Sequence, residues 1–452
     1  MKIFNEFYKK LFFLSVPIII RTTVSSFSGF IDNLMVGQLG VNSISAVSII
    51  NNILFVFICT ITGTIAGASI FSTQYFGIKD YNGVKKVFHI KFILFIIVFF
   101  LYFLFVHFFY DKLISLFMTQ GQQEVKNEIM GLCDEYLFYA FLSLIPFGIN
   151  TVFSTTISES GNTFKPMIIC LSCTALNTLL NYCFINGNFG FHAMGIHGAA
   201  FATFISRLIE MICMIVISIK TDFFKKFFNK IEIDIALLKD ILKKSIPLAI
   251  DDFLFSFSFV VGIQIYSLQN INNITIISIA SIINAFFINL IVSLSIAAEI
   301  ILGHELGQNN LEKANDYACK VIKITIISSV ILSIFIYLLS LYVPYFYNIE
   351  NSLQYYAERC IQMYAYSFVI TALSCVIFFI LRSGGNTLLL SLIDGVFIWL
   401  IELPLCYLLI KFSSLNLPTI YLLVLLSAII KVLIGFIFIK RKIWLNNLIE
   451  EK

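Results

Sequence analysis

Residues 17–40 read PIIIRTTVSSFSGFIDNLMVGQLG, and this stretch decides the fold. It is apolar enough for the second half of a transmembrane helix, yet it carries an arginine, an aspartate and several hydroxyl groups. At about 100° per residue, four polar residues fall on one helical face: Arg21, Ser25, Ser28 and Asp32. A charged side chain in lipid costs at least about 2.5–3.5 kcal/mol. We therefore expect the polar stripe to face protein or a water-filled cavity, and to mark a functional site.

The composition places the whole chain in a membrane. Hydrophobic residues make up 59% of the 452 residues, charged residues only 12%, and the mean hydropathy is +0.93. Soluble domains carry roughly 25% charged residues, so an ordinary soluble protein is excluded. The net charge is small, +4, and the basic residues follow topology instead of forming a patch. We expect the lipid bilayer as a partner and no nucleic acid.

Scanning for apolar stretches of about 20 residues predicts twelve transmembrane helices. They are expected near 11–33, 43–72, 88–110, 132–156, 165–186, 196–219, 243–268, 273–303, 321–343, 358–381, 388–410 and 418–439. No small-residue cleavage site follows the first apolar run, so we expect that span to be retained.

The connections between the predicted helices alternate in charge. Lysine and arginine gather in every second connection, including Lys85, Lys86, Lys91, Lys165, Lys230 and Arg382. The opposite connections hold only Lys112, Lys126, Lys411 and the borderline Arg359. The positive-inside rule then predicts a multi-pass protein of the cell membrane with both termini in the cytoplasm.

The two halves of the chain repeat each other. Shifting by 230 residues without a gap matches Pro17 with Pro247 and Gly77 with Gly307, and the SGNT at 160–163 meets the GGNT at 384–387 at a shift of 224. With six helices in each half, we expect two parallel six-helix bundles related by a pseudo-two-fold axis along the membrane normal. This is a transporter architecture, in which alternating access comes from rocking one bundle against the other. The predicted parts are an N-lobe (1–219), a basic cytoplasmic linker (220–242) and a C-lobe (243–452).

Several stretches resemble the multidrug and toxic compound extrusion (MATE) family. They are GFIDNLMVGQLG (29–40), GIKDYNGVKKV (77–87), NTLLNYCFINGNFGFHAMGIHGAAFATFISR (177–207) and LRSGGNTLLLSLIDGVFIWLIELP (381–404). The resemblance covers nearly the whole chain, and the stretches come in family order. The resemblance implies a secondary antiporter for multidrug efflux, which exports organic, often cationic and amphipathic, compounds in exchange for Na⁺ or H⁺.

The resemblance also implies a coupling site in the N-lobe. Asp32 matches the first-helix aspartate on which cation coupling is centred, and Thr203 matches a sixth-helix threonine close to it. Asn177 and Asn181 fall on a fifth-helix motif whose second position is aspartate in many relatives, so Asn181 removes a charge. A C-lobe ion site known in one subgroup is expected to be absent, because Thr371 and Phe255 stand where that subgroup has carboxylates.

A single carboxylate can exchange Na⁺, H⁺ and a cationic substrate in mutual competition. Asp32 suits this role, and Na⁺ would use Asp32, Asn177 and Asn181 as oxygen ligands. No cofactor is expected beyond the coupling ion. In the competing interpretation, Asp32 only meets headgroups and water near a helix end, and the two asparagines only form an interhelical hydrogen-bonded pair.

The repeat suggests a gate as well. Arg21 is matched by Asp251, with Asp252 alongside, so equivalent positions on the first and seventh helices carry opposite charges. We expect Arg21 to pair with Asp251 or Asp252 and to help close the cytoplasmic side. The alternative is that Arg21 pairs along its own helix or acts on Asp32.

Further charges lie inside the predicted spans. Arg207 and Glu210, at i and i+3, favour a structural ion pair. Glu299, Asp394 and Glu402 are candidates for lining a C-lobe cavity, with packing roles as the alternative.

Two other functions compete with drug efflux. A lipid-linked-saccharide flippase of the same superfamily is the alternative transporter, although such proteins usually add helices beyond twelve. An intramembrane enzyme is disfavoured because the sequence contains no HExxH and no GxSxG. We expect a monomeric, non-enzymatic exporter of small organic substrates.

Overall fold

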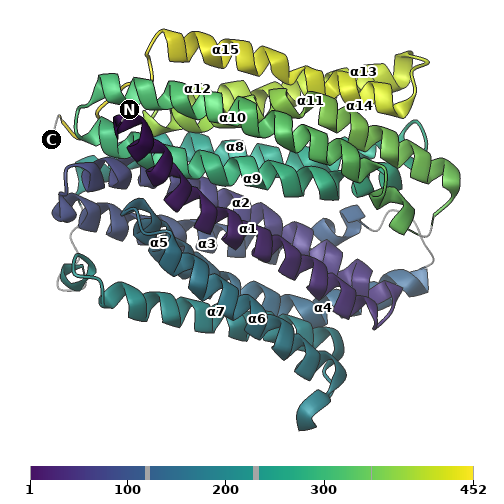
Figure 1. The fold of residues 1–452 in the computed structure, drawn as a ribbon. Coiled ribbons are helices and arrows are strands. Elements are labelled where there is room, and N and C mark those ends of the chain that lie inside the picture. Colours follow the sequence, from purple (N-terminus) through teal and green to yellow (C-terminus); the bar gives the residue numbers. More distant parts are fainter. Residues whose placement is uncertain (1, 118–122, 228–233, 348, 451–452) are drawn as a thin grey trace. The chain divides into compact units, whose positions relative to one another are not determined.

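The computed structural model describes residues 2–117, 123–227, 234–347 and 349–450. Within these ranges all regular structure is helical, and twelve helical segments are long and apolar enough to cross a membrane (Figure 1). The predicted all-α fold with twelve spans is confirmed. The spans extend beyond the predicted limits, as in Glu6–Gly37 against 11–33, because a helix continues with polar residues after the apolar run has ended.

The chain divides into two compact units. Unit 1 comprises Met1–Ile19, Thr73–Asp80 and Ile241–Lys452, and unit 2 comprises Ile20–Ser72 and Tyr81–Asp240. The predicted lobes at 1–219 and 243–452 stay a prediction. Part of the predicted linker 220–242, residues 228–233 with Lys230, lies outside the described residues.

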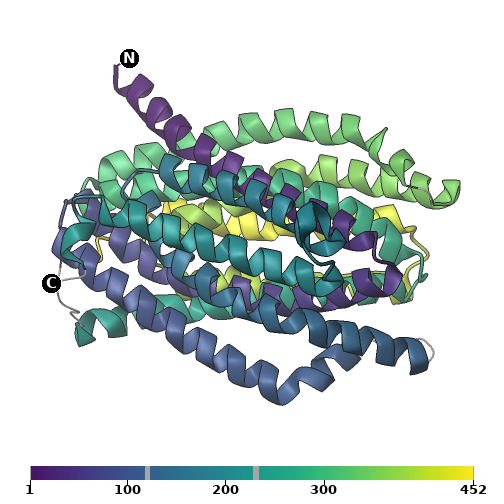
Figure 2. The same cartoon turned by 90° about the horizontal axis from the view of Figure 1, so that it is seen from below.

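Unit 2 is built on α7, which packs against α4, α5 and α6, and Figure 2 shows these teal and blue helices from a second direction. The elements that lie wholly or partly in this unit are α1 (Lys2–Gly37), α2 (Val41–Gly77), α3 (Tyr81–Phe117), α4 (Gln123–Leu142), α5 (Leu144–Glu159), α6 (Phe164–Asn186), η1 (Asn188–Gly190), α7 (Gly195–Ile219), η2 (Phe224–Lys226) and the start of α8, up to Asp240. The helices α4 and α5 form a single span, Val125–Glu159.

Unit 1 is built on α11, which packs against α9, α10, α14 and α15 around a continuous apolar core. Its elements are α8 (Ile235–Ser267), α9 (Asn273–Gly307), α10 (Leu311–Ser340), η3 (Val343–Phe346), α11 (Asn351–Ser383), α12 (Thr387–Ser391), η4 (Leu392–Val396), η5 (Ile398–Glu402), α13 (Leu403–Phe412), α14 (Leu417–Leu426) and α15 (Ala428–Lys440). The segments η4 and η5 are π-helical. Such wide turns are rare and often occur at functional sites.

A buried ion pair holds α3 to α5 in unit 2. Lys91 Nζ lies 2.7 and 2.8 Å from the two carboxylate oxygens of Glu159, and Ser72 at the end of α2 also bonds this carboxylate. Lys91 is fully buried and Glu159 is 4% exposed. The prediction that Lys85, Lys86 and Lys91 lie in a cytoplasmic connection was wrong, because α3 already begins at Tyr81 and contains all three.

Two glycines matched by the repeat allow a backbone contact within unit 1. A Cβ atom at Gly77 would overlap the carbonyl oxygen of His304, and one at Gly307 would overlap the carbonyl oxygen of Gln74. Each helix end therefore lies directly on the backbone of the other. Only glycine leaves room for this approach, which explains why the repeat keeps this residue in both halves.

The segment 443–448, which we call the C-terminal latch, folds back onto the same helix ends. Trp444 is fully buried. The Leu448 N–H donates to Gln74 Oε1 (2.8 Å), and Gln74 Nε2 donates to the Asn446 carbonyl (3.2 Å). On the other side, Asn386 Nδ2 donates to the Ile443 carbonyl (2.9 Å). The latch thus joins the end of α2 to the loop after α11.

Asp234 caps the start of α8 and connects it to α3. Its Oδ1 accepts from the N–H groups of Ala236 (3.1 Å) and Leu237 (3.2 Å), and its Oδ2 lies 3.1 Å from Lys86 Nζ. The hydrogen bond from Leu237, followed by that from Lys86, lowers the pKa of Asp234 below its usual value. The cap therefore stabilises the fold fully above the unfolded pKa of about 3.9, and its contribution is lost as the pH falls through the lower folded pKa.

We expect Asp234→Ala to lower the free energy of unfolding by about 1 kcal/mol at neutral pH, as for other helix caps. Asp234→Asn keeps an oxygen for the cap and is the matched control, with a smaller loss. Thermal unfolding in detergent, followed at neutral pH and below pH 4 or so, measures both. An equal loss at the two pH values would contradict the role of the ionised cap.

Candidate functional site

The predicted coupling aspartate contacts α6. Asn181 Nδ2 donates to Asp32 Oδ1 over 2.6 Å. Asn181 is 1% exposed, and Asp32 is half-buried. The carboxylate of α1 therefore points at protein and not only at headgroups and water.

The neighbouring polar residues form a chain of hydrogen bonds across α6 and α7. Asn181 Nδ2 lies 3.5 Å from Asn177 Oδ1, and Asn177 Nδ2 donates to Ser206 Oγ (3.2 Å). Thr203, one turn before Ser206, uses its hydroxyl to bond the Ala199 carbonyl (3.1 Å). The structure thus brings Asp32, Asn181 and Asn177 together, with Thr203 on the same helix as Ser206.

One amide oxygen at this site accepts no hydrogen bond from the described residues. Asn181 Oδ1 is buried and has no hydrogen-bond partner among the residues that the structure describes. An amide oxygen beside a carboxylate is a ligand set that a hard cation such as Na⁺ can use. Asn181 supplies a neutral amide at a position where the family motif often has a second carboxylate. The single negative charge of Asp32 suits a monovalent cation or a proton.

Arg207 belongs to the electrostatic surroundings of the site. It was predicted to form an ion pair with Glu210, and its place near Asp32 was missed. Its Nη1 donates to Ser143 Oγ (2.9 Å) and its guanidinium lies 5.1 Å from the centre of the Phe147 ring. Asp32 and Glu210 are its charged neighbours. The signal was available, because Arg207 follows Thr203 by four residues and therefore shares its helical face.

The polar stripe of α1 faces its own unit. Ser25 Oγ lies 3.3 Å from Cys170 Sγ on α6, and Glu210 on α7 is a charged neighbour of Arg21. Arg21 belongs to unit 2, whereas Asp251 and Asp252 belong to unit 1. The gate between them stays a prediction.

The three candidates of the C-lobe make three ion pairs with two basic residues of unit 1. Glu299 accepts two bonds from Arg382, 2.7 Å from Nε and 2.5 Å from Nη2. Lys431 Nζ lies 2.9 Å from Asp394 Oδ1 and 2.8 Å from Glu402 Oε1. The structure thus brings Asp394 and Glu402 together on one lysine, and their place in a cavity stays a prediction.

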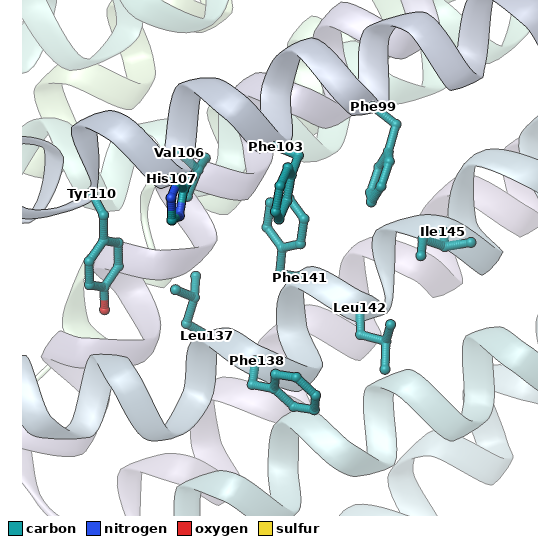
Figure 3. A pocket seen from close by; sticks show the side chains of 10 residues that line it. All are labelled: Phe99, Phe103, Val106, His107, Tyr110, Leu137, Phe138, Phe141, Leu142 and Ile145. Atoms are coloured by element: carbon teal, nitrogen blue, oxygen red, sulfur yellow. The ribbon is translucent and has the colours of Figure 1, made fainter.

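A cavity of about 510 Å³ lies elsewhere in unit 2, between α3 and the span formed by α4 and α5 (Figure 3). Its lining is almost entirely apolar and aromatic, with His107 and Tyr110 at one end. None of the predicted site residues lines it, so it is separate from the Asp32 site.

Comparison with known proteins identifies a family. A family model described as MatE matches residues 17–183 and 247–408. The chain belongs to the MatE family. The two matched segments begin at Pro17 and Pro247, which the internal repeat pairs, so the model recognises both halves. The resemblance to MATE transporters is confirmed.

Relatives of this MatE chain extend over most of its length. It is 24% identical over 410 residues to the probable multidrug resistance protein YoeA of Bacillus subtilis (strain 168), covering 89% of this chain and 86% of that protein. It is 25% identical over 417 residues to the probable multidrug resistance protein NorM of Halalkalibacterium halodurans, covering 90% and 88%.

A solved structure shows the same fold. It is an outward-facing multidrug resistance MATE family transporter of the MOP superfamily, with a TM-score of 0.85 at 19% identity, covering 97% of this chain and 96% of that one. The chain is thus a multi-pass membrane protein of a multidrug efflux transporter family.

Proposed function

We propose that this MatE protein is a secondary antiporter that exports organic, cationic amphipathic compounds in exchange for Na⁺ or H⁺, coupled through Asp32. The observation that carries the proposal is the bond of 2.6 Å from Asn181 Nδ2 to Asp32 Oδ1, beside the buried and unpartnered Asn181 Oδ1. Relatives described as multidrug resistance proteins support efflux over a lipid-linked-saccharide flippase, and transport over catalysis.

The proposed coupling is a competition for one negative charge. A coupling ion bound at Asp32 neutralises the carboxylate, with the amide oxygens of Asn181 and Asn177 as neutral partners. A cationic substrate is attracted to the same carboxylate only when the ion has left. Because each ligand displaces the other, one lobe movement can carry the ion inward and the next can carry the substrate outward.

We further propose that the protein works as a monomer in the cytoplasmic membrane, with both termini inside and the coupling ion as its only inorganic partner. The alternation of basic residues along the connections supports this orientation. Small organic compounds and the surrounding lipid are the remaining partners in the proposal.

Transport by purified protein in liposomes tests the function. We expect ethidium, a cationic amphipathic dye, to move against an imposed Na⁺ or proton gradient, and addition of the dye to evoke a flux of the coupling ion. Imposing each gradient alone identifies the ion. Dye that moves with neither gradient would overturn the proposal, and movement of a lipid-linked saccharide instead would favour the flippase.

A further inference from the structure

One cluster of charged side chains inside unit 1 holds more carboxyl groups than basic groups. The acidic side chains that act on one another there are Asp251 and Asp252 on α8, Glu299 on α9, Asp394 on η4 and Glu402 on η5, and the basic ones are Arg382 on α11 and Lys431 on α15. If every group in this described cluster were ionised, three carboxylates would lack a balancing cation. Unbalanced charge inside a membrane is costly, so the cluster must take up positive charge.

The two basic groups are already engaged. Arg382 makes its bidentate contact with Glu299, and Lys431 bridges Asp394 and Glu402. Two of the three unbalanced carboxylates are therefore Asp251 and Asp252, neighbours on α8, and the third belongs to the two carboxylates that share Lys431. Asp252 has Arg382 as a charged neighbour, whereas the nearest charged groups acting on Asp251 are mainly acidic.

Asp251 is buried against the π-helical segment. It is 3% exposed, and its Oδ1 has no hydrogen-bond partner among the described residues. This oxygen points at Gly395, where a Cβ atom would lie only 2.6 Å from it. The wide turn of η4 and the missing side chain of Gly395 thus make room for the Asp251 carboxyl group against the η4 backbone. The Gly395 backbone and Lys431 compensate a carboxylate here only in part, because Asp394 and Asp252 repel it, whereas a protonated carboxyl group is neutral.

We propose that Asp251 is a proton-binding site of the C-terminal half, separate from Asp32. The titratable and charged groups that face it are Asp252 on α8, Asp394 on η4 and Lys431 on α15, with Arg382 and Cys375 on α11 behind them. The proton adds to the carboxylate oxygen, and one negative charge of the cluster disappears. A proton fits better than a metal ion, because among the described residues no three His, Cys, Asp or Glu side chains are placed so that they could hold one.

Infrared difference spectroscopy of the purified full-length chain tests the site directly, because a protonated carboxyl group has its own C=O stretching band. We expect the wild-type protein to keep a protonated carboxyl band at neutral pH that Asp251→Asn lacks. Gly395→Ala, whose new methyl group meets Asp251 Oδ1, is expected to shift the titration of this band by about one pH unit or more. Asp316→Asn, which changes an exposed carboxylate of α10, is the matched control and should leave the band unchanged.

Asp32→Asn separates this inference from the proposed function, since it should stop coupled transport and leave the Asp251 band in place. Size-exclusion chromatography confirms that each variant is folded before the spectra are compared. The same carboxyl band in wild-type and Asp251→Asn protein at every pH would overturn the proposal. A band that responds to Na⁺ concentration and not to pH would also overturn it, in favour of a metal cation.

Discussion

Replacing Asp32 by asparagine is expected to abolish ion-coupled export and to leave the protein folded. Asparagine has nearly the same shape, and its carbonyl oxygen can accept the bond that Asn181 Nδ2 now donates to Asp32. It carries no negative charge and takes up no proton at physiological pH. The competition between ion and substrate therefore disappears, and dye transport should fall to the level of liposomes without protein.

Drug susceptibility and flux measure this effect together. A sensitive bacterial host that makes the wild-type protein should survive higher concentrations of ethidium, and a host that makes Asp32→Asn should not. Asp222→Asn is the matched control, because Asp222 is an exposed carboxylate of the same unit that pairs with Lys225. Equal resistance from wild-type and Asp32→Asn protein would refute coupling through this residue.

Loss of the buried ion pair is expected to have the largest effect on stability. In Lys91→Met, the Glu159 carboxylate stays buried and loses the ammonium group that neutralises it. Removing one partner of such a pair typically costs about 3–5 kcal/mol. Thermal unfolding in detergent should show a strongly lowered midpoint for this variant.

The double variant Lys91→Met, Glu159→Gln shows whether the effect comes from the unpaired charge. Both side chains are then neutral, so most of the lost stability should return. Lys225→Met is the exposed control, and we expect no measurable change from it. If the double variant were as unstable as Lys91→Met, the loss would come from packing and not from charge.

The twelve spans were predictable because each requires about 20 mostly apolar residues in a row, and such stretches can be read directly from the sequence. The ends of the helices were not, since a helix can continue into polar sequence without a change in hydropathy. Lys91 shows the consequence. The positive-inside rule counts a lysine near an apolar run as a loop residue, and only tertiary structure reveals that Glu159, far along the chain, lies close enough to neutralise it.

For the candidate site, the sequence predicted residues whose role stays a prediction, and the structure shows only which of them are in contact. The polar stripe and the family motifs indicated Asp32, Asn177 and Asn181, and a hydrogen bond now joins the first and last of these. The partners of Lys431 could not be predicted, because its contacts with Asp394 and Glu402 join α15 to another segment, and helical spacing within one segment does not show them. The position of Asp251 Oδ1 next to Gly395 could not be predicted either, because the two residues are far apart in the sequence.

The C-terminal latch also affects how the protein can be labelled and purified. A fluorescent protein or affinity tag joined directly behind the latch would disturb the segment that buries Trp444 and bonds Gln74. A stop codon before Ile443 would remove that cover altogether and expose the surfaces of Gln74 and Gly384 to water. Reporters are better attached through a long flexible spacer, so that the end of α2 keeps its contacts while the tag remains accessible.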